Sequence, residues 1–317
     1  MKTALVALVC LLVAAVIVLP VAHLIGQVDR ISGAFDGLAD RPDDSATAEA
    51  GSLDVLVVGV TRSADTQPTS WLPEARQAVS VMVMHFDADR RGATAVGIPL
   101  DVKVNVYGDG TRSLGSVPDV GEPAQLVGTV EKLTGLHIDH LAVLDWQAFS
   151  TLIDRVGGVD MSTTGGNGAV SFGGIRMQAT GKDALKAVTP QRGGDSVALT
   201  QSQLGLMDAV VDGSLHQELH KSPLLVYNFL DALTENLAVD EEWSTPSMAR
   251  LFLSVWNLRS GDMKYVTVPV SCIKVRGQCR PKLDEKAAPG FWSAVAQDRT
   301  DEWLAENNNR GRVESSR

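Results

Sequence analysis

Residues 129–161 read TVEKLTGLHIDHLAVLDWQAFSTLIDRVGGVDM and decide the fold class. Gly135 follows a helical run, and glycine is the usual residue at a left-handed helix C-cap. His140–Leu144 reads as a strand, and Val159 begins another one after a Gly-Gly break. Between these strands, apolar residues recur at the i, i+3, i+4 and i+7 positions of an amphipathic helix: Phe149, Leu152, Ile153 and Val156. Helix, strand, helix and strand in one short stretch predict an α/β fold, a sheet with helices packed on it.

Three motifs in the same stretch have the spacing of a known family. They are L-T-G-L-x-I-D-H at residues 133–140, D-x-x-x-F at 145–149 and L-I-D-x-x-G-G-V-D at 152–160. This pattern resembles the core signature of the LytR–CpsA–Psr (LCP) family. Enzymatic members of that family are membrane-anchored and move glycopolymers from a polyprenyl-pyrophosphate carrier onto the cell wall. The resemblance extends from about Leu53 to Val270, and it implies a central, largely mixed β-sheet with helices on both faces, in three layers.

The composition and the net charge argue against a nucleic-acid-binding protein. Hydrophobic residues make up 44% of the chain, enough for a sizeable core, but the formal net charge is −10. A nucleic-acid binder needs a basic face for the phosphates, and no helix-turn-helix with a basic recognition face is visible. The six histidines show no HExxH or paired-His spacing, so the sequence predicts no metal site. His137 and His140 belong to the family signature.

The N-terminal residues predict a membrane anchor. Residues 4–25 are apolar apart from Cys10, Pro20 and His23, and 22 helical residues span about 33 Å, enough for a bilayer core. A cleavable signal peptide is the alternative, but Pro20 would stand at the −3 position of the cleavage site before Ala22. We therefore predict a transmembrane anchor over 1–26, a cytoplasmic N-terminus and an exported C-terminal domain.

The rest of the chain divides into three further segments. A linker is predicted for residues 27–51, with an amphipathic stalk over part of it as the alternative, and an LCP-like extracytoplasmic domain is predicted for 52–305. A polar, disordered tail is predicted for 306–317. Expected strands are Leu53–Val60, Val79–Asp87, Ala93–Ile98, Val102–Val106 and Tyr265–Val270. Residues 108–123 and 162–174 read as a long polar loop and a hairpin loop, and helices are expected over 181–187, from 199, 222–237, 245–258 and 289–305.

Two of the three cysteines are candidates for a disulfide. Cys272 and Cys279 flank a turn with a glycine, and a hairpin would bring them opposite one another, within reach of a disulfide. Two free thiols are the alternative. A disulfide would agree with an oxidising compartment outside the cytoplasm. Cys10 lies within the apolar N-terminal run and reads as a small lipid-facing residue.

Most of the positions that carry the chemistry in catalytic family members hold other residues here. The resemblance implies an R-S-D-T segment, a P-R-D turn, a loop lysine before an asparagine, an R-x-R pair and an R-x-x-R-Q-Q helix start. The corresponding residues are Gln77-Ala78-Val79-Ser80, Pro99-Leu100-Asp101, Arg112 with Leu114, Thr189-Pro190-Gln191 and Ala198-Leu199-Thr200-Gln201-Ser202-Gln203. In this register Val79 takes the place of the family's metal-binding aspartate, and several phosphate-binding arginines are replaced. A slip of one or two residues would restore Arg76 or Arg192, but no single slip restores the whole set. Phosphoryl-type transfer relies on such cations almost entirely.

A small set of residues remains as candidates for a site. Asp101 is the candidate catalytic residue, with a turn aspartate as the alternative. Four arginines are candidates for anion binding, each with a solvated surface residue as its alternative: Arg62, Arg76, Arg112 and Arg192. Ser63 and Ser80 have no visible histidine or aspartate partners for nucleophilic catalysis. The signature aspartates Asp139, Asp145, Asp154 and Asp160 read as turn and cap residues.

The sequence thus predicts a single-pass membrane protein of cell-envelope glycopolymer assembly. It would bind a lipid-linked (polyprenyl-pyrophosphate) or wall glycopolymer, with impaired or no catalysis. No nucleic-acid partner is predicted, and a paralogous LCP protein is a candidate partner. One alternative is an active transferase that uses a rearranged arginine set and magnesium. A second is a transcriptional regulator, against which the anchor and the acidic charge argue.

Overall fold

The computed structural model describes most of the chain after the apolar N-terminal run. The described residues are 26, 28–39, 41–42, 51–62, 76–120, 122–155, 158–163, 170–172, 178–190, 194–212, 231, 234, 237–256, 258–275, 278–308 and 310–313. The predicted anchor and Arg192 lie outside them. Within the described residues, no helix is both long enough and apolar enough to cross a membrane.

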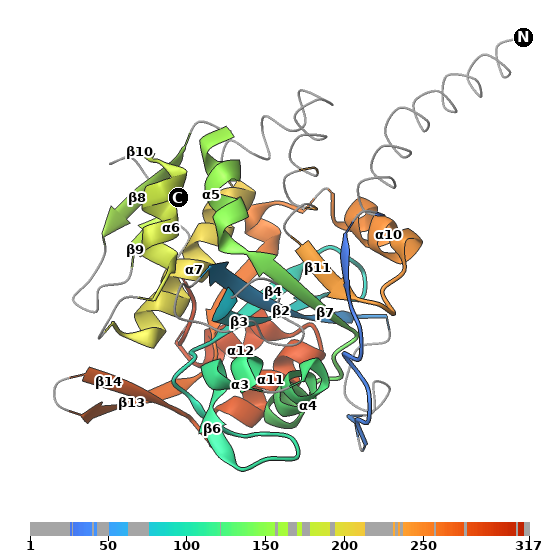
Figure 1. The fold of residues 1–317 in the computed structure, drawn as a ribbon. Helices are drawn as coiled ribbons and strands as arrows, with labels where there is room; N and C mark the ends of the chain where they lie inside the picture. Colours follow the sequence, from blue (N-terminus) through green and yellow to red (C-terminus); the bar gives the residue numbers. More distant parts are fainter. Residues whose placement is uncertain are drawn as a thin grey trace, which may run out of the picture.

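A seven-stranded mixed sheet forms the centre of the molecule (Figure 1). From one edge to the other, its strands are β1 (Asp29–Ile31), β11 (Leu237–Asp240), β7 (His140–Asp145), β2 (Leu53–Arg62), β3 (Arg76–Phe86), β4 (Ala93–Ile98) and β12 (Met263–Thr267). The pairs β1–β11, β7–β2 and β4–β12 are parallel, and the other three are antiparallel. The central strands are apolar on both faces, as expected for strands covered on both sides.

Helices cover both faces of the sheet, which confirms the predicted fold class (Figure 1). One face packs against α3 (Val117–Val120), α4 (Pro123–Thr134), α11 (Ala288–Ala296) and α12 (Thr300–Glu306). The other face packs against α5 (Trp146–Arg155), α6 (Gly181–Val188), α7 (Ser196–Asp212) and α10 (Thr245–Val255). Each face has its own hydrophobic core. Phe291 and Trp292 are fully buried in the first, and Leu204 is fully buried in the second.

Local sequence signals account for several helix ends. Gly135 adopts φ 75° directly after α4 and its N–H donates to the carbonyl of Glu131, the left-handed cap that the sequence predicts. α6 begins with a capping box, in which Thr180 and Asp183 exchange side-chain and backbone hydrogen bonds. Ser244 caps α10, and a proline follows in its first turn. α6 agrees with the predicted limits within one residue, whereas α10 begins at the predicted Thr245 but ends at Val255, three residues before the predicted end.

Three small sheets flank the central one. β8 (Val159–Thr163) pairs with β9 (Val170–Phe172) and with β10 (Gln178–Ala179), which agrees with the predicted hairpin. β13 (Val270–Val275) pairs with β14 (Gln278–Leu283) in the hairpin that carries the two cysteines. The strand expected at Val102–Val106 is shorter, because β5 (Lys103–Asn105) pairs only with β6 (Thr111–Ser113). The predicted loop over 108–123 therefore contains β6, the short 3₁₀ helix η1 (Leu114–Ser116) and α3.

Short segments at both ends of the described chain pair with strands of the central sheet. The sequence instead predicts a linker over 27–51 and a disordered tail over 306–317. β1 pairs with β11, and Val28 and Ile31 are buried in the two cores. At the other end, Arg312 forms an isolated antiparallel bridge with Val266 of β12. These short segments lack the periodicity that marks a strand, and pairing with an existing edge is what orders them.

Two further expectations differ from the structure. The single helix expected over 289–305 is broken into α11 and α12, because Asp298 adopts φ 56° in the turn between them. A residue in the left-handed region cannot continue a right-handed helix. The helix expected over 222–237 lies largely outside the described residues, and its expected end at Leu237 is instead the first residue of β11. A second short 3₁₀ helix, η2 (Ser260–Asp262), precedes β12.

Candidate functional site

Three of the site residues predicted from the sequence lie at one end of the central sheet. β3 runs antiparallel to both of its neighbours, so its first residues lie beside the last residues of β2 and β4. Arg62 is the register partner of Arg76, and Ile98 is the register partner of Val81. Asp101 follows β4 in the next turn. We call this end of the strands, defined by Arg62, Arg76 and Asp101, the arginine end of the sheet.

A β-bulge shapes the start of β3 at this end. Gly59 pairs with Ser80 and Val60 pairs with Ala78, so Val79 is the extra residue without a partner on β2. Its carbonyl oxygen accepts a hydrogen bond of 2.8 Å from Gln203 Nε2 of α7, and that amide also donates to the Val188 carbonyl. The Val79 side chain is buried in the second core. A hydrophobic, packed residue thus stands where the resemblance implies a metal-binding aspartate.

Gly59 is required for the contact next to the bulge. Trp146 Nε1 donates a hydrogen bond of 3.1 Å to the Ser80 hydroxyl, and both side chains are buried. A Cβ atom at Gly59 would lie 2.1 Å from Ser80 Oγ and 2.2 Å from Trp146 Nε1. Ser80 therefore acts as the hydrogen-bond partner of an indole in a closed contact, which is no arrangement for a nucleophile.

Two more positions of the resemblance belong to the core. Leu114, where the family pattern has an asparagine, is fully buried in the first core. Leu100, where the pattern has an arginine, packs against that core, and a Cβ at Gly115 would meet its side chain at 2.9 Å. With Val79, three positions that would carry polar groups in a catalytic site are filled by packed apolar side chains.

The backbone brings two of the four candidate arginines together. Arg62 and Arg76 are directly opposite in the antiparallel register of β2 and β3. Like charges directly opposite each other destabilise a strand pair, unless an anion offsets them. The backbone register therefore places two arginine positions side by side, and arginine is the residue type that engages phosphate oxygens in pairs.

Asp101 and Arg112 lie in the loops beside this end. Asp101 is exposed in a turn closed by a hydrogen bond of 3.1 Å from the Val102 N–H to the Pro99 carbonyl. Arg112 is half-exposed on β6, and its Nε and Nη2 atoms lie 2.9 and 2.8 Å from Asp109 Oδ2. The Gly110 N–H and Arg112 hold the pKa of the Asp109 carboxyl below its usual range. Arg112 is thus engaged within its own hairpin, and Arg192 lies outside the described residues.

The signature aspartates are structural, as predicted, where their contacts are described. Asp139 Oδ2 accepts a hydrogen bond of 2.7 Å from the N–H of Asp54 at the start of β2. Asp145 accepts from the N–H of Gln147 in the first turn of α5, at 2.8 Å. Asp154 Oδ1 accepts from the N–H of Gly181, 2.7 Å away, and so ties α5 to α6.

The signature histidines are also held by local partners. His137 Nδ1 lies 3.0 Å from the Pro42 carbonyl, and His140 Nδ1 lies 3.2 Å from Asp240 Oδ2. The His140 ring stacks on Trp243, with ring centroids 4.3 Å apart. These contacts fix the orientation of both rings.

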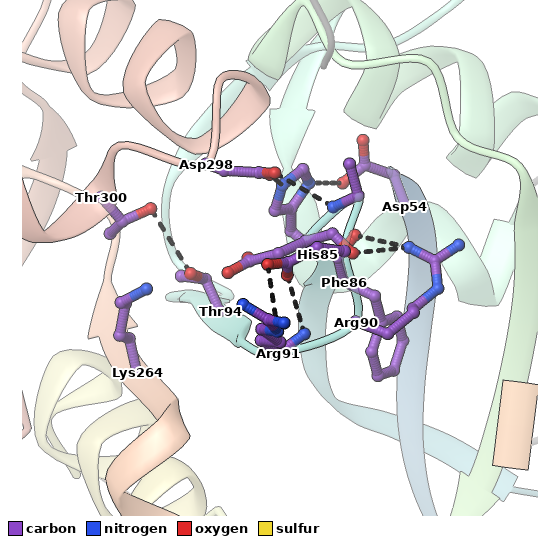
Figure 2. A network of polar contacts seen from close by, with 12 residues as sticks. Asp54, His85, Phe86, Arg90, Arg91, Thr94, Lys264, Asp298 and Thr300 are labelled. Atoms are coloured by element: carbon purple, nitrogen blue, oxygen red, sulfur yellow. Dashed lines mark hydrogen bonds and ion pairs between the residues drawn. The ribbon is translucent and has the colours of Figure 1, made fainter. Parts of the chain in front are cut away.

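Sequence reasoning missed a polar cluster at the opposite end of the sheet. It consists of His85, Asp87 and Asp298. Figure 2 shows the His85 ring between Asp298 and Asp54. His85 is fully buried, although it lies in a strand that reads as apolar. The sequence gives little signal for this cluster, because Asp298 is more than two hundred residues from the other members.

A comparison with protein families identifies the chain over most of its length. The model of the LytR_cpsA_psr family matches residues 35–296. The match begins after β1 and includes all of the central sheet's other strands.

Curated proteins of cell-wall synthesis are similar in sequence. The chain is 27% identical to the cell wall biosynthesis protein LcpA of Corynebacterium glutamicum, over 80% of this chain and 57% of that protein. It is 31% identical to the probable cell wall biosynthesis protein LcpB of the same organism, over 42% of this chain and 41% of that protein. The chain thus spans only about half the length of these two relatives. It is 22% identical to the polyisoprenyl-teichoic acid–peptidoglycan teichoic acid transferase TagU of Halalkalibacterium halodurans, over 83% of this chain and 91% of that protein.

Solved structures share the fold at lower identity. The LytR-Csp2A-Psr enzyme from Actinomyces oris superimposes with a TM-score of 0.61 at 18% identity, covering 85% of this chain and 94% of that one. TagT bound to LI-WTA superimposes with a TM-score of 0.58 at 16% identity, covering 81% and 95%. The family model, the curated relatives and the shared fold agree, and the chain belongs to the LytR–CpsA–Psr family.

Proposed function

We propose that this protein binds a lipid-linked or cell-wall glycopolymer at the arginine end of its sheet and does not transfer it. In this proposal the ligand is a polyprenyl-pyrophosphate-linked polymer, and the protein serves cell-envelope glycopolymer assembly, beside a catalytic paralogue of the same family. The observation that carries the proposal is the combination at one end of β3: paired arginine positions remain, while the position of the metal carboxylate is a buried valine.

The loss of catalysis is supported by what replaces the polar positions. Val79, Leu100 and Leu114 pack in or against the two cores, so none of them offers a donor or a charge. Cleaving a pyrophosphate bond needs a cation to neutralise the charge on the leaving group, and a carboxylate normally holds that cation. Each lost arginine–phosphate contact removes roughly 1.5–3 kcal/mol of stabilisation.

Retained anion binding is supported by the register and by the relatives. Arg62 and Arg76 are cross-strand partners in the register of β2 and β3, and like charges at such positions are unfavourable without an anion. Among the relatives, TagU and TagT are named as polyisoprenyl-teichoic acid–peptidoglycan teichoic acid transferases. A ligand that combines a lipid carrier with a phosphorylated polymer would satisfy both arginines at this end of the sheet.

Calorimetry with a polyprenyl pyrophosphate tests this proposal on the full-length chain in detergent. We expect binding that is the same with and without magnesium, and no cleavage of the ligand. Replacing both Arg62 and Arg76 with alanine is expected to weaken binding about 10–100-fold, since each 1.4 kcal/mol corresponds to a factor of ten. Arg91→Ala is the matched control, because its guanidinium is almost fully exposed in a turn at the other end of the sheet and pairs only loosely with Asp89.

Two results would contradict the proposal. Tight binding that requires magnesium, with cleavage of the lipid-linked substrate, would establish the active transferase instead. Absence of binding, or binding that the double arginine variant leaves unchanged, would rule out the arginine end as the polymer site.

Shorter forms of the protein made for these experiments should begin before Val28, because β1 completes the edge of the sheet.

The proposal also places the folded domain outside the membrane, on a single N-terminal anchor, with a disulfide between Cys272 and Cys279. It is supported by the apolar residues 4–25 and by the hairpin β13–β14. In this hairpin Cys272 is opposite Pro281, and Cys279 is opposite Lys274. The two cysteines are therefore diagonal neighbours, two positions apart along the strands. The sequence instead predicts that they lie directly opposite one another. We expect protein purified without reductant to resist alkylation at both residues under denaturing conditions, as measured by intact mass. Two alkylated thiols would refute the disulfide.

A further inference from the structure

We propose that His85, Asp87 and Asp298 form a binding site for a divalent transition-metal ion, Zn²⁺ or Mn²⁺. One ligand atom from each residue lies within 4.8 Å of the others, which is the spacing needed to share one ion. The site lies at the far end of β2 and β3 from the arginine end. Asp54 is the second residue of β2 and Arg62 is its last, so at about 3.3 Å per residue the two sites are roughly 25 Å apart. It is therefore separate from any metal used in polymer transfer.

His85 is oriented as metal-ligating histidines are. Its ring is fully buried, and Nδ1 lies 2.9 Å from Asp54 Oδ1 while Nε2 lies 2.8 Å from Asp298 Oδ1 (Figure 2). Asp54 is fixed in turn, because its N–H and carbonyl both bond to Asp139. A carboxylate on one ring nitrogen sets the tautomer and aims the other nitrogen at the metal. Asp54 therefore serves as the positioning residue behind the ligand His85.

Asp298 reaches the site from a separate element. It occupies the turn between α11 and α12 with φ 56°, a conformation that aspartate tolerates better than most residues. Its Oδ2 atom accepts a hydrogen bond of 3.0 Å from the Ala88 N–H, which leaves Oδ1 directed at His85. The Asp298 side chain is about one-fifth exposed. An ion can therefore enter from the solvent side of this turn.

Asp87 provides the observation that a purely structural ion pair does not explain. Its Oδ1 atom is buried and has no hydrogen-bond partner among the described residues. Gly92 leaves room for this carboxylate, since a Cβ there would lie 2.2 Å from Asp87 Oδ2. A buried carboxylate oxygen without a partner is costly, and a divalent ion would supply the missing partner.

The neighbouring Lys264 does not supply a hydrogen-bond partner for Asp87 Oδ1. Lys264 Nζ pairs with Asp301 Oδ2 at 3.3 Å, on the side of Thr300 (Figure 2). A protonated His85 between Asp54 and Asp298 would satisfy those two carboxylates: burial alone lowers the His85 pKa, but the hydrogen bonds and charges of Asp54 and then Asp298 raise it overall. A protonated His85 would still leave Asp87 Oδ1 without a hydrogen-bond partner among the described residues.

The donor set fits the proposed ions. The two carboxylates are hard oxygen ligands, and the imidazole nitrogen is a borderline ligand that favours Zn²⁺ or Mn²⁺ over Ca²⁺ and Mg²⁺, which prefer oxygen alone. Two carboxylate charges balance a divalent ion. The ion would join the end of β3 to the α11–α12 turn, and so hold the C-terminal helices against the sheet.

Calorimetric titration and thermal unfolding of the full-length chain, stripped with a chelator, test the site. We expect one equivalent of Zn²⁺ or Mn²⁺ to bind with low-micromolar or tighter affinity and to raise the Tm by several degrees. Asp87→Asn and Asp298→Asn are expected to weaken binding at least tenfold, and Asp54→Asn about 10–100-fold. Co²⁺ gives a readout besides affinity, because its visible absorption band should appear in the wild type and be lost in Asp87→Asn.

Asp89→Asn is the matched control, since that carboxylate lies two residues from Asp87 but is exposed. It is expected to bind the ion as the wild type does. The proposal is overturned if no saturable binding occurs, or if Asp87→Asn and Asp298→Asn bind as tightly as the wild type. It is also overturned if metal leaves the Tm unchanged while Asp87→Asn raises the Tm of the stripped protein, because the cluster would then be an ion-pair network alone.

Discussion

Replacing Arg41 with methionine is expected to lower the free energy of unfolding by about 3–5 kcal/mol, because it leaves a buried charge without its partner. Glu131 of α4 is almost fully buried, and Arg41 Nη2 and Nε reach its Oε1 atom at 2.7 and 3.0 Å. The same oxygen accepts the N–H of Ile138, 3.0 Å away. Urea or guanidinium unfolding of wild type and variant measures the difference.

A double variant separates the buried charge from the lost contacts. Glu131→Gln removes the charge but keeps an oxygen for the Ile138 N–H, so Arg41→Met with Glu131→Gln is expected to be more stable than Arg41→Met alone. Arg112→Met is the control, because its pair with Asp109 is half-exposed, and exposed pairs contribute only about 0–1 kcal/mol. If Arg41→Met and Arg112→Met cost the same, the buried charge has no special weight.

Gly181→Ala is expected to destabilise the protein by about 3 kcal/mol, at the upper end of the usual range for overpacking. A Cβ at this first residue of α6 would lie 1.8 Å from the Ser150 carbonyl oxygen of α5. The obstructing atom belongs to a helix backbone, so α5 and α6 would have to separate. Separation would also stretch the hydrogen bond between the Gly181 N–H and Asp154. Denaturant unfolding measures the loss.

Gly290→Ala is the matched control for this prediction. Gly290 lies in α11, and the nearest heavy atom to a new Cβ is Trp303 Nε1 at 3.7 Å, an ordinary contact. Alanine is favoured over glycine in a helix by about 1 kcal/mol, so this variant should be slightly stabilised. Equal stability of the Gly181 and Gly290 variants would show that α5 and α6 separate at little cost.

Elements with strong local signals were predictable from the sequence. β4 has the predicted limits, Ala93–Ile98, because an apolar run lies between a turn and Pro99. α4 ends where Gly135 supplies a left-handed cap, and β7 begins at His140 as predicted. The family signature also anticipated the mixed sheet with helices on both faces.

The candidate site was predictable only in part. The sequence predicts that Val79 takes the place of the family's metal aspartate, but the bulge that leaves this residue without a partner on β2 depends on the register of β2 and β3. The direct opposition of Arg62 and Arg76 depends on the same register. Arg112 reads as a candidate in the sequence, whereas the structure pairs it with Asp109.

The sequence by itself determined the family and the order of the main helices and strands, and it predicted that most of the catalytic positions hold other residues. Each of these follows from residue types at short, fixed spacings. Only the tertiary structure decided that β1 and the segment around Arg312 join the sheet, and that Asp298 meets His85. Such contacts join residues more than two hundred positions apart or strands too short to have a pattern. Their stability comes from packing and pairing in the folded chain, which local propensity does not encode.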